Sequence, residues 1–289
     1  SPRPLLAFGD ERPLNPASTI KLLTTFAALD QLGPAYQWTT QVFADGTMAG
    51  DVLTGDLLLK GGGDPRLTLE NFWLMLRALQ MCADSGMMAM VHAENGLAID
   101  VLIEQAVAAG NTSPDFHSRT RPPELEAEAV HRAAVLSRVA GNAPLYIVHL
   151  SSKEAMHEVV DARSRDTNIF AETCPQYLHL TLEEHLGQGW PDGAAYVCST
   201  PLRSKHEHHA RNLWEGLRDD TLAVVSTDHC PFCLREQKLM NGESFNVVPN
   251  GIGGVEHRVD LIHQGVVAGE ITTKANVAIH DLQANNARN

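Results

Sequence analysis

Three apolar segments that end next to a potential metal ligand are the feature that most constrains the fold of this chain. One directly precedes His92, another directly precedes His149, and the third ends shortly before Asp228. In parallel α/β proteins the carboxyl ends of the strands lie at one edge of the sheet, where active sites form. Imidazole nitrogens and carboxylate oxygens are ligands that zinc accepts. The pattern therefore predicts a parallel α/β fold with a zinc site built from His92, His149 and Asp228.

Strand-like and helix-like segments alternate regularly from residue 81 to residue 272. The expected strands cover residues 87–91, 145–149, 168–173, 195–199 and 222–226. The expected helices cover residues 97–109, 123–140, 151–163 and 204–218. Ser151 and Ser204 each stand three residues before a glutamate, which predicts that each of them caps a helix. Units of this kind predict parallel strands with helices outside them.

The first 80 residues form a separate segment by pattern. Its expected elements are helices at 15–33 and 69–84 and strands at 37–44 and 51–60. Ser18 and Lys21 stand three residues apart in the first helix and therefore lie on one face. The lysine amine can take the proton of the serine hydroxyl, which makes the pair a candidate nucleophile and base. A solvated lysine on an ordinary helix is the alternative interpretation.

Composition limits the class of partner. The 289 residues carry a formal net charge of −13, which disfavours nucleic acid and anionic membrane surfaces. No apolar run approaches the ~20 residues that a membrane-spanning helix needs. The five cysteines are an odd number, which argues against a disulfide framework and predicts a reducing, cytoplasmic location.

Short motifs at the predicted strand ends carry a resemblance to a known family. They are Val-His-Ala-Glu-Asn-Gly (91–96), Tyr-Ile-Val-His-Leu-Ser (146–151), Glu-Thr-Cys-Pro-Gln-Tyr (172–177), Tyr-Val-Cys-Ser-Thr-Pro-Leu-Arg (196–203), Ser-Thr-Asp-His-Cys-Pro-Phe (226–232) and Val-Pro-Asn-Gly (248–251). Through these motifs the segment 81–272 closely resembles the hydantoinase and dihydropyrimidinase branch of the amidohydrolase superfamily.

This resemblance implies a (β/α)8 barrel, of which the chain matches the second half, with two zinc ions bridged by a carboxylated lysine and a hydroxide. It implies that His92 and His149 bind one zinc ion. Asp228 would bind the other ion and act as general acid and base. Ser199 and Asn250 would contact the amide edge of the substrate through backbone groups. The implied reaction opens a cyclic amide, such as a hydantoin or a dihydropyrimidine, to an N-carbamoyl amino acid.

The chain departs from that family upstream. The family's first two ligands form a His-x-His at the end of the first barrel strand, and this chain has no histidine before His92. The bridging lysine should also lie upstream. Lys60 ends an apolar segment about 30 residues before His92, the length of one strand-helix-strand step. It is a candidate for the bridging position, although a solvated lysine at a strand end is the simpler interpretation.

A second resemblance covers the start of the chain. Asn-Pro-Ala-Ser-Thr-Ile-Lys (15–21) and Gly-Asp-Leu-Leu-Leu-Lys-Gly-Gly-Gly-Asp-Pro (55–65) are similar to the serine penicillin-binding D-Ala-D-Ala carboxypeptidases. This resemblance implies that Ser18 is the acylated nucleophile and Lys21 its base. That family also uses a downstream Lys-Thr-Gly, which this chain does not contain.

The expected fold is therefore α/β, with a partial TIM-like (β/α) barrel at 81–272, a carboxypeptidase-like α/β segment at 1–80 and an unassigned tail at 273–289. The expected function is zinc-dependent hydrolysis of a small cyclic amide, impaired by the missing ligands. One alternative is a fragment of a serine D-Ala-D-Ala carboxypeptidase. The other is a non-catalytic scaffold, because a half-barrel leaves strand edges and apolar surface that favour a homo-oligomer.

Overall fold

The computed structural model describes residues 41–49, 52–60 and 69–272. Strands β1 (Gln41–Ala49) and β2 (Val52–Lys60) pair with each other in a two-stranded sheet. Strand β1 runs five residues past the end of the strand expected at 37–44. The predicted helix at 15–33 lies outside the described residues. The chain forms two compact units, residues 1–45 with 57–65 and residues 46–56 with 66–289.

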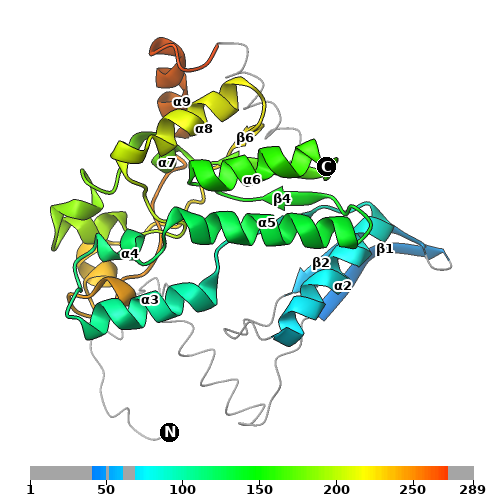
Figure 1. Ribbon diagram of the computed structural model, residues 1–289, viewed down its shortest axis with the longest axis horizontal. Helices are drawn as coiled ribbons and strands as arrows, with labels where there is room; N and C mark the ends of the chain where they lie inside the picture. Colours follow the sequence, from blue (N-terminus) through cyan, green and yellow to red (C-terminus); the bar gives the residue numbers. More distant parts are fainter. Residues whose placement is uncertain (1–40, 50–51, 61–68, 273–289) are drawn as a thin grey trace, which may run out of the picture. The chain divides into compact units, whose positions relative to one another are not determined.

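The larger unit is built on a parallel sheet of four strands (Figure 1). These are β3 (Ala89–Val91), β4 (Leu145–Ile147), β5 (Ile169–Thr173) and β6 (Val224–Val225), in the order β3-β4-β5-β6. In register, Met90 lies beside Tyr146 and Tyr146 lies beside Phe170. The parallel sheet predicted from the alternating pattern is therefore present, with β3 and β6 as its edges among the described strands.

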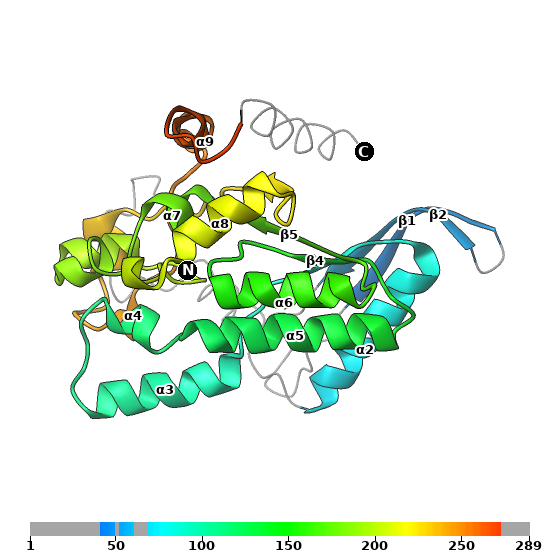
Figure 2. The same cartoon turned by 45° about the horizontal axis from the view of Figure 1, so that its top comes forward.

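Helices cover one face of this sheet because alternate strand residues are apolar and bury on that side. Leu145 and Ile147 of β4 and Ile169 and Ala171 of β5 are no more than 2% exposed. Burying each large side chain of this kind stabilises the fold by about 1.5–3 kcal/mol. The covering helices are α2 (Leu69–Ser85), α5 (Pro123–Val139), α6 (Lys153–Ser164) and α8 (His209–Arg218). Each contacts the next, and α5 and α6 lie side by side (Figure 2).

The opposite face of the sheet is open in the described residues. Met90 is 67% exposed and Phe170 is 40% exposed, and both belong to the row that runs across β3, β4 and β5. Parallel sheets are normally covered on both faces. This unit therefore presents apolar sheet surface that the described part of the chain does not bury.

The remaining elements form the connections and the carboxyl-terminal region. They are α3 (Gly96–Ala108), α4 (Phe116–Arg119), α7 (Pro175–His179), α9 (Arg258–Val267), the short 3₁₀ segments Leu186–Gln188, Asp192–Tyr196, Lys205–Glu207 and Phe245–Val247, and a π-helical turn at Leu234–Lys238. None of the described helices has the length and apolarity of a membrane span.

Three local predictions are wrong. Ser204 caps the short 3₁₀ segment Lys205–Glu207, and α8 begins only at His209, without a side-chain cap. No strand forms at 195–199, because residues 192–196 wind into a 3₁₀ helix and the chain then passes into a loop. The cap of α6 is Ser152, whose hydroxyl accepts a hydrogen bond from Ala155 N, and not Ser151. The hydroxyl of Ser151 instead donates to the buried carboxylate of Glu126 at 2.9 Å. A tertiary contact of Ser151 therefore moves the helix cap from Ser151 to Ser152.

Candidate functional site

Two of the predicted ligands, His92 and His149, meet at the carboxyl edge of the sheet. His92 follows the last residue of β3, and His149 comes two residues after the end of β4. Because Val91 and Ile147 are register partners, the two strands end side by side. Nδ1 of His92 lies 2.9 Å from Nε2 of His149. At this distance one nitrogen donates a hydrogen bond to the other, and a metal ion that replaces the shared proton can be bound by both nitrogens.

Glu94 orients the ring of His92. Its Oε2 lies 3.0 Å from Nε2 of His92, and its side chain is 7% exposed. Burial lowers the pKa of His92, but the hydrogen bond and charge of Glu94, with the more distant charges of Glu126 and Asp228, outweigh it and raise the pKa overall. A carboxylate that accepts from the outer nitrogen of a metal-binding histidine fixes its ring and tautomer. Glu94 therefore leaves Nδ1 of His92 directed at His149.

His149 is held in its neutral form. Its side chain is buried, and that burial, followed by the positive charge of His92, lowers its pKa. The second ring nitrogen, Nδ1, is buried and has no hydrogen-bond partner in the part of the chain that the structure describes. Its backbone has a φ of 41°, and Thr200 Oγ1 donates to its carbonyl at 3.1 Å. Because neutral imidazole is the form that binds metal, the lowered pKa of His149 favours zinc binding, whereas at His92 zinc has to compete with a proton.

Asp228 is on the exposed loop after β6, with a φ of 46°. Its charge raises the pKa of both His92 and His149, which shows that it lies within electrostatic range of the pair. The ligating atoms of these three residues do not all fall within 4.8 Å of one another. Among the described residues, the one set of three or more potential ligands that meets this distance is elsewhere. The structure therefore brings the two histidines together and leaves Asp228 further away.

The loops of Ser199 and Asn250 are joined to each other and to His149. Gly251 N, next to Asn250, donates to the carbonyl of Val197 at 3.0 Å. A Cβ on Gly251 would come within 2.2 Å of the carbonyl oxygen of Cys230, so this close approach requires glycine. Thr200, next to Ser199, holds the carbonyl of His149. The backbone groups proposed for substrate contact are thus tied to the histidine pair.

A buried ion pair supports this edge of the sheet. Arg203 Nη2 lies 3.0 Å from Glu126 Oε2, with the side chains 4% and 2% exposed. Ser151 donates to Glu126 through its backbone N, at 2.8 Å, as well as through its hydroxyl. No role was predicted from the sequence for Glu94, Glu126 or Arg203. The sequence position could have pointed to two of them. Glu94 stands two residues after His92, and Arg203 is the last residue of the motif at 196–203.

Three further candidate residues were predicted from the sequence. Ser18 and Lys21 lie outside the described residues. Lys60 ends β2, which pairs with β1 in a two-stranded sheet. His209 is 1% exposed, and Glu207 and Glu154 lie at 2.8 and 3.3 Å from its two ring nitrogens. A cavity of about 330 Å³ near Gln176 and Phe232 is not lined by His92, His149 or Asp228.

The fold and site define an α/β protein whose parallel sheet carries a histidine pair at its carboxyl edge. Residues 2–164 match the D-Ala-D-Ala carboxypeptidase 3 (S13) family. The chain is 55% identical over 197 residues to a D-hydantoinase of Streptomyces coelicolor, covering 68% of this chain and 41% of that protein. It is 40% identical over 206 residues to a D-hydantoinase of Geobacillus stearothermophilus, covering 71% and 43%.

Solved structures give the same relationship. A crystal structure of a D-hydantoinase matches with a TM-score of 0.68 at 40% identity, over 71% of this chain and 44% of that one. The dihydropyrimidinase of Brevibacillus agri matches with a TM-score of 0.67 at 39% identity, with the same coverage.

By the family match the chain belongs to the D-Ala-D-Ala carboxypeptidase 3 (S13) family, and over about two thirds of its length it is a homologue of the hydantoinases. The S13 match and the hydantoinase match together cover more residues than the 289 of the chain, so the two matches overlap. The S13 match runs past residue 80. The chain spans less than half the length of these hydantoinases.

Proposed function

We propose that the segment 81–272 is a metal-dependent hydrolase of small cyclic amides and that its metal is zinc. The observation that carries the proposal is the 2.9 Å approach of His92 Nδ1 to His149 Nε2 at the carboxyl edge of a parallel sheet. The hydantoinase relatives support the substrate class, hydantoins and dihydropyrimidines. The parallel sheet supports a fold that corresponds to the second half of a (β/α)8 barrel.

In this proposal His92 and His149 hold zinc, and the chemistry that zinc supplies when bound is activation of water and polarisation of the amide carbonyl. Asp228 takes the proton of the attacking water and delivers it to the leaving ring nitrogen. Its exposure to solvent and its electrostatic contact with both histidines suit this role. Backbone groups of Ser199 and Asn250 orient the amide edge of the substrate, because their loops are tied to His149.

The donor set is smaller than the resemblance requires, since no histidine precedes His92. We therefore expect turnover slower than that of a complete hydantoinase. The test is ring opening of hydantoin and dihydrouracil by the purified chain with added Zn²⁺, with His92→Ala/His149→Ala as the comparison. Product formed by the wild type and lost in the double variant supports the proposal. Equal rates in both proteins, or no product from either, contradict it.

The S13 family match favours a second candidate function in the same chain. Residues 2–164 include Ser18 and Lys21, which this second proposal assigns as the acyl-enzyme nucleophile and its base. It predicts a covalent adduct with a β-lactam, in which the Ser18 hydroxyl opens the ring and the ring nitrogen takes its proton. Lack of labelling by penicillin removes this candidate.

The open sheet face favours a third role, as a scaffold that assembles as a homo-oligomer. The exposed row through Met90 and Phe170 provides the apolar surface for such an assembly. This role requires no zinc and no substrate. A light-scattering mass that equals one chain contradicts it.

A further inference from the structure

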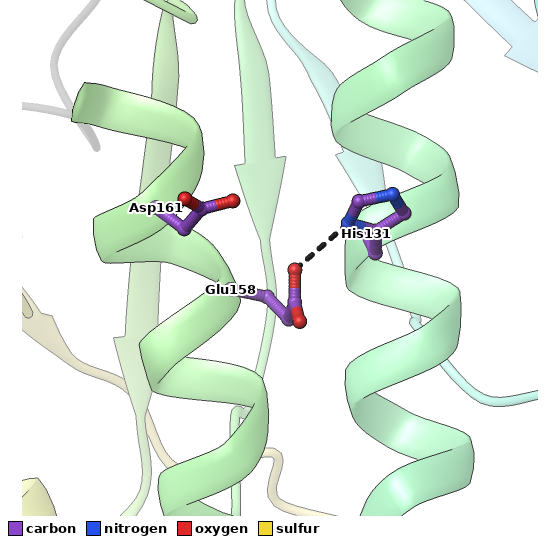
Figure 3. A group of neighbouring side chains, drawn as sticks. All are labelled: His131, Glu158 and Asp161. Carbon is purple, nitrogen blue, oxygen red and sulfur yellow. Dashed lines mark hydrogen bonds and ion pairs between the residues drawn. The ribbon is translucent and has the colours of Figure 1, made fainter. Parts of the chain in front are cut away.

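A second group of potential ligands lies between two helices on the outer layer of the larger unit. His131 of α5 faces Glu158 and Asp161 of α6 across the groove between the helices (Figure 3). One ligand atom from each of the three lies within 4.8 Å of the others. His131 Nδ1 lies 2.9 Å from Glu158 Oε2. Glu158 and Asp161 are three residues apart in α6 and therefore project from the same face.

A buried hydroxyl without a partner opens onto the same groove. A small cavity of about 10 Å³ is lined by these three residues and by Thr167. Thr167 is 5% exposed, and its Oγ1 has no hydrogen-bond partner among the described residues. Buried hydroxyl groups normally have a partner, and a cavity of this size holds about one water molecule. The hydroxyl and the cavity therefore point to a small ligand that is bound beside the three side chains.

The charges of the groove suit a divalent cation. Asp161 Oδ2 pairs with Arg165 at 2.7 Å, which leaves Oδ1 as a potential ligand. Glu158 uses one oxygen for His131 and keeps the other. The Nδ1 lone pair of His131 can bind a metal once its proton resides on Nε2. One imidazole with two carboxylates favours zinc over magnesium, which prefers oxygen ligands alone.

We propose that His131, Glu158 and Asp161 bind a zinc ion, with a water molecule as the fourth ligand that donates a hydrogen bond to Thr167 Oγ1. Three protein ligands and one water complete the tetrahedral set that zinc prefers. The ion joins α5 to α6 and so acts as a structural clamp. This site is independent of the hydrolase proposal, because it shares no residue with the His92 and His149 pair.

Zinc titration by calorimetry tests the site in the full chain, in a His92→Ala/His149→Ala background that removes the other histidine pair. Adding His131→Ala should remove one zinc per chain or weaken its binding at least tenfold. The matched control is His157→Ala, because His157 is an exposed histidine of α6 outside the group. Equal isotherms for His131→Ala and His157→Ala, or no zinc binding in the background protein, overturn the proposal.

Two measurements keep the test independent of that background. In the wild type, Zn²⁺ but not Mg²⁺ should slow modification of His131 by diethyl pyrocarbonate, as mapped by mass spectrometry, and leave His157 unprotected. Thr167→Val should leave the zinc-free protein at least as stable and weaken zinc binding about tenfold, as loss of a group that orients a metal ligand does. Unprotected His131 contradicts the site, and unchanged zinc affinity of Thr167→Val contradicts the water-mediated contact.

Discussion

Arg203 and Glu126 form an ion pair at 3.0 Å although 77 positions separate them in the chain. Both side chains are buried, and Arg203 also donates through Nε to Ser151 Oγ at 3.0 Å and through Nη1 to the carbonyl of Arg121. The pair therefore connects three parts of the chain. These are helix α5, Ser151 after strand β4, and the segment 196–203 that ends at Arg203. If one partner is lost, the charge of the other remains buried without a counter-ion.

Removing one member of this pair should destabilise the fold strongly. We expect Glu126→Gln to lower the free energy of unfolding by about 3–5 kcal/mol, because it leaves the Arg203 charge buried and unpaired. Urea unfolding followed by circular dichroism measures the loss. The matched control is Glu128→Gln, whose ion pair with Arg132 on the same helix is largely exposed and should cost less than about 1 kcal/mol. Similar losses in both variants would contradict the buried pair.

Lys238 predicts a pH dependence of stability. Its side chain is 2% exposed and its Nζ donates to the carbonyl of Val197 at 2.8 Å. Burial lowers its pKa from 10.5 to about 8. Between these two pH values the unfolded chain binds the proton more tightly than the folded chain, so the free energy of unfolding rises with pH across the window. Below pH 8 the charged, buried amine opposes folding by up to about 3 kcal/mol.

The variant Lys238→Met should remove that part of the rise and be at least as stable as the wild type at pH 7. Gly251 N continues to donate to Val197 O, so no carbonyl is orphaned. The difference between wild type and variant, measured by urea unfolding from pH 7 to 11, isolates Lys238 from other titrating groups. Lys205→Met, at an exposed lysine, should retain the wild-type rise between pH 8 and 10.5, because Glu184 raises the pKa of Lys205 above this window. An unchanged profile in Lys238→Met would show that the amine is not desolvated.

Asp228→Asn tests the proposed proton transfer. We expect ring opening to fall about 10²–10⁴-fold, the usual contribution of a general acid or base, because an amide cannot carry the proton. Zinc bound through His92 and His149 should remain, as measured by plasma mass spectrometry. Asp220→Asn, at another exposed aspartate, should keep the wild-type rate. A variant with full activity would exclude Asp228 as the acid and base.

Ser18→Ala tests the carboxypeptidase-like site. Fluorescent penicillin should label the wild type covalently and not this variant, because the proposal assigns the Ser18 hydroxyl as the nucleophile and Lys21, three residues later in the sequence, as its base. The neighbouring Thr19→Ala should be labelled as the wild type is. In-gel fluorescence of the denatured proteins reports the adduct. Persistent labelling of Ser18→Ala would place the nucleophile elsewhere.

Met90→Glu tests self-association through the open sheet face. The wild type should elute as an oligomer in size-exclusion chromatography with light scattering, and a charge at this 67% exposed position should shift it towards the mass of one chain. Val160→Glu is the control, because Val160 is exposed on α6, which covers the opposite face. Dissociation by both variants, or by neither, would argue against the sheet face as the contact.

The sequence by itself determined the parts of this protein that depend on local pattern. Apolar runs followed by amphipathic segments placed β3 to β6 and the helices α3, α5, α6 and α8 within five residues, because the backbone period is set by neighbours along the chain. The parallel order of the strands brings His92 and His149 to one edge, so their proximity was predictable from two strand ends.

Only the tertiary structure decided how buried polar groups are paired. Ser151 donates to Glu126 and leaves the cap to Ser152, and the segment before Ser199 forms a 3₁₀ helix where its apolar residues had predicted a strand. His209 is buried because Glu154 and Glu207 reach it from separate segments. These outcomes depend on contacts between distant residues, and the cost of leaving a buried polar group unpaired outweighs the local preference of the sequence.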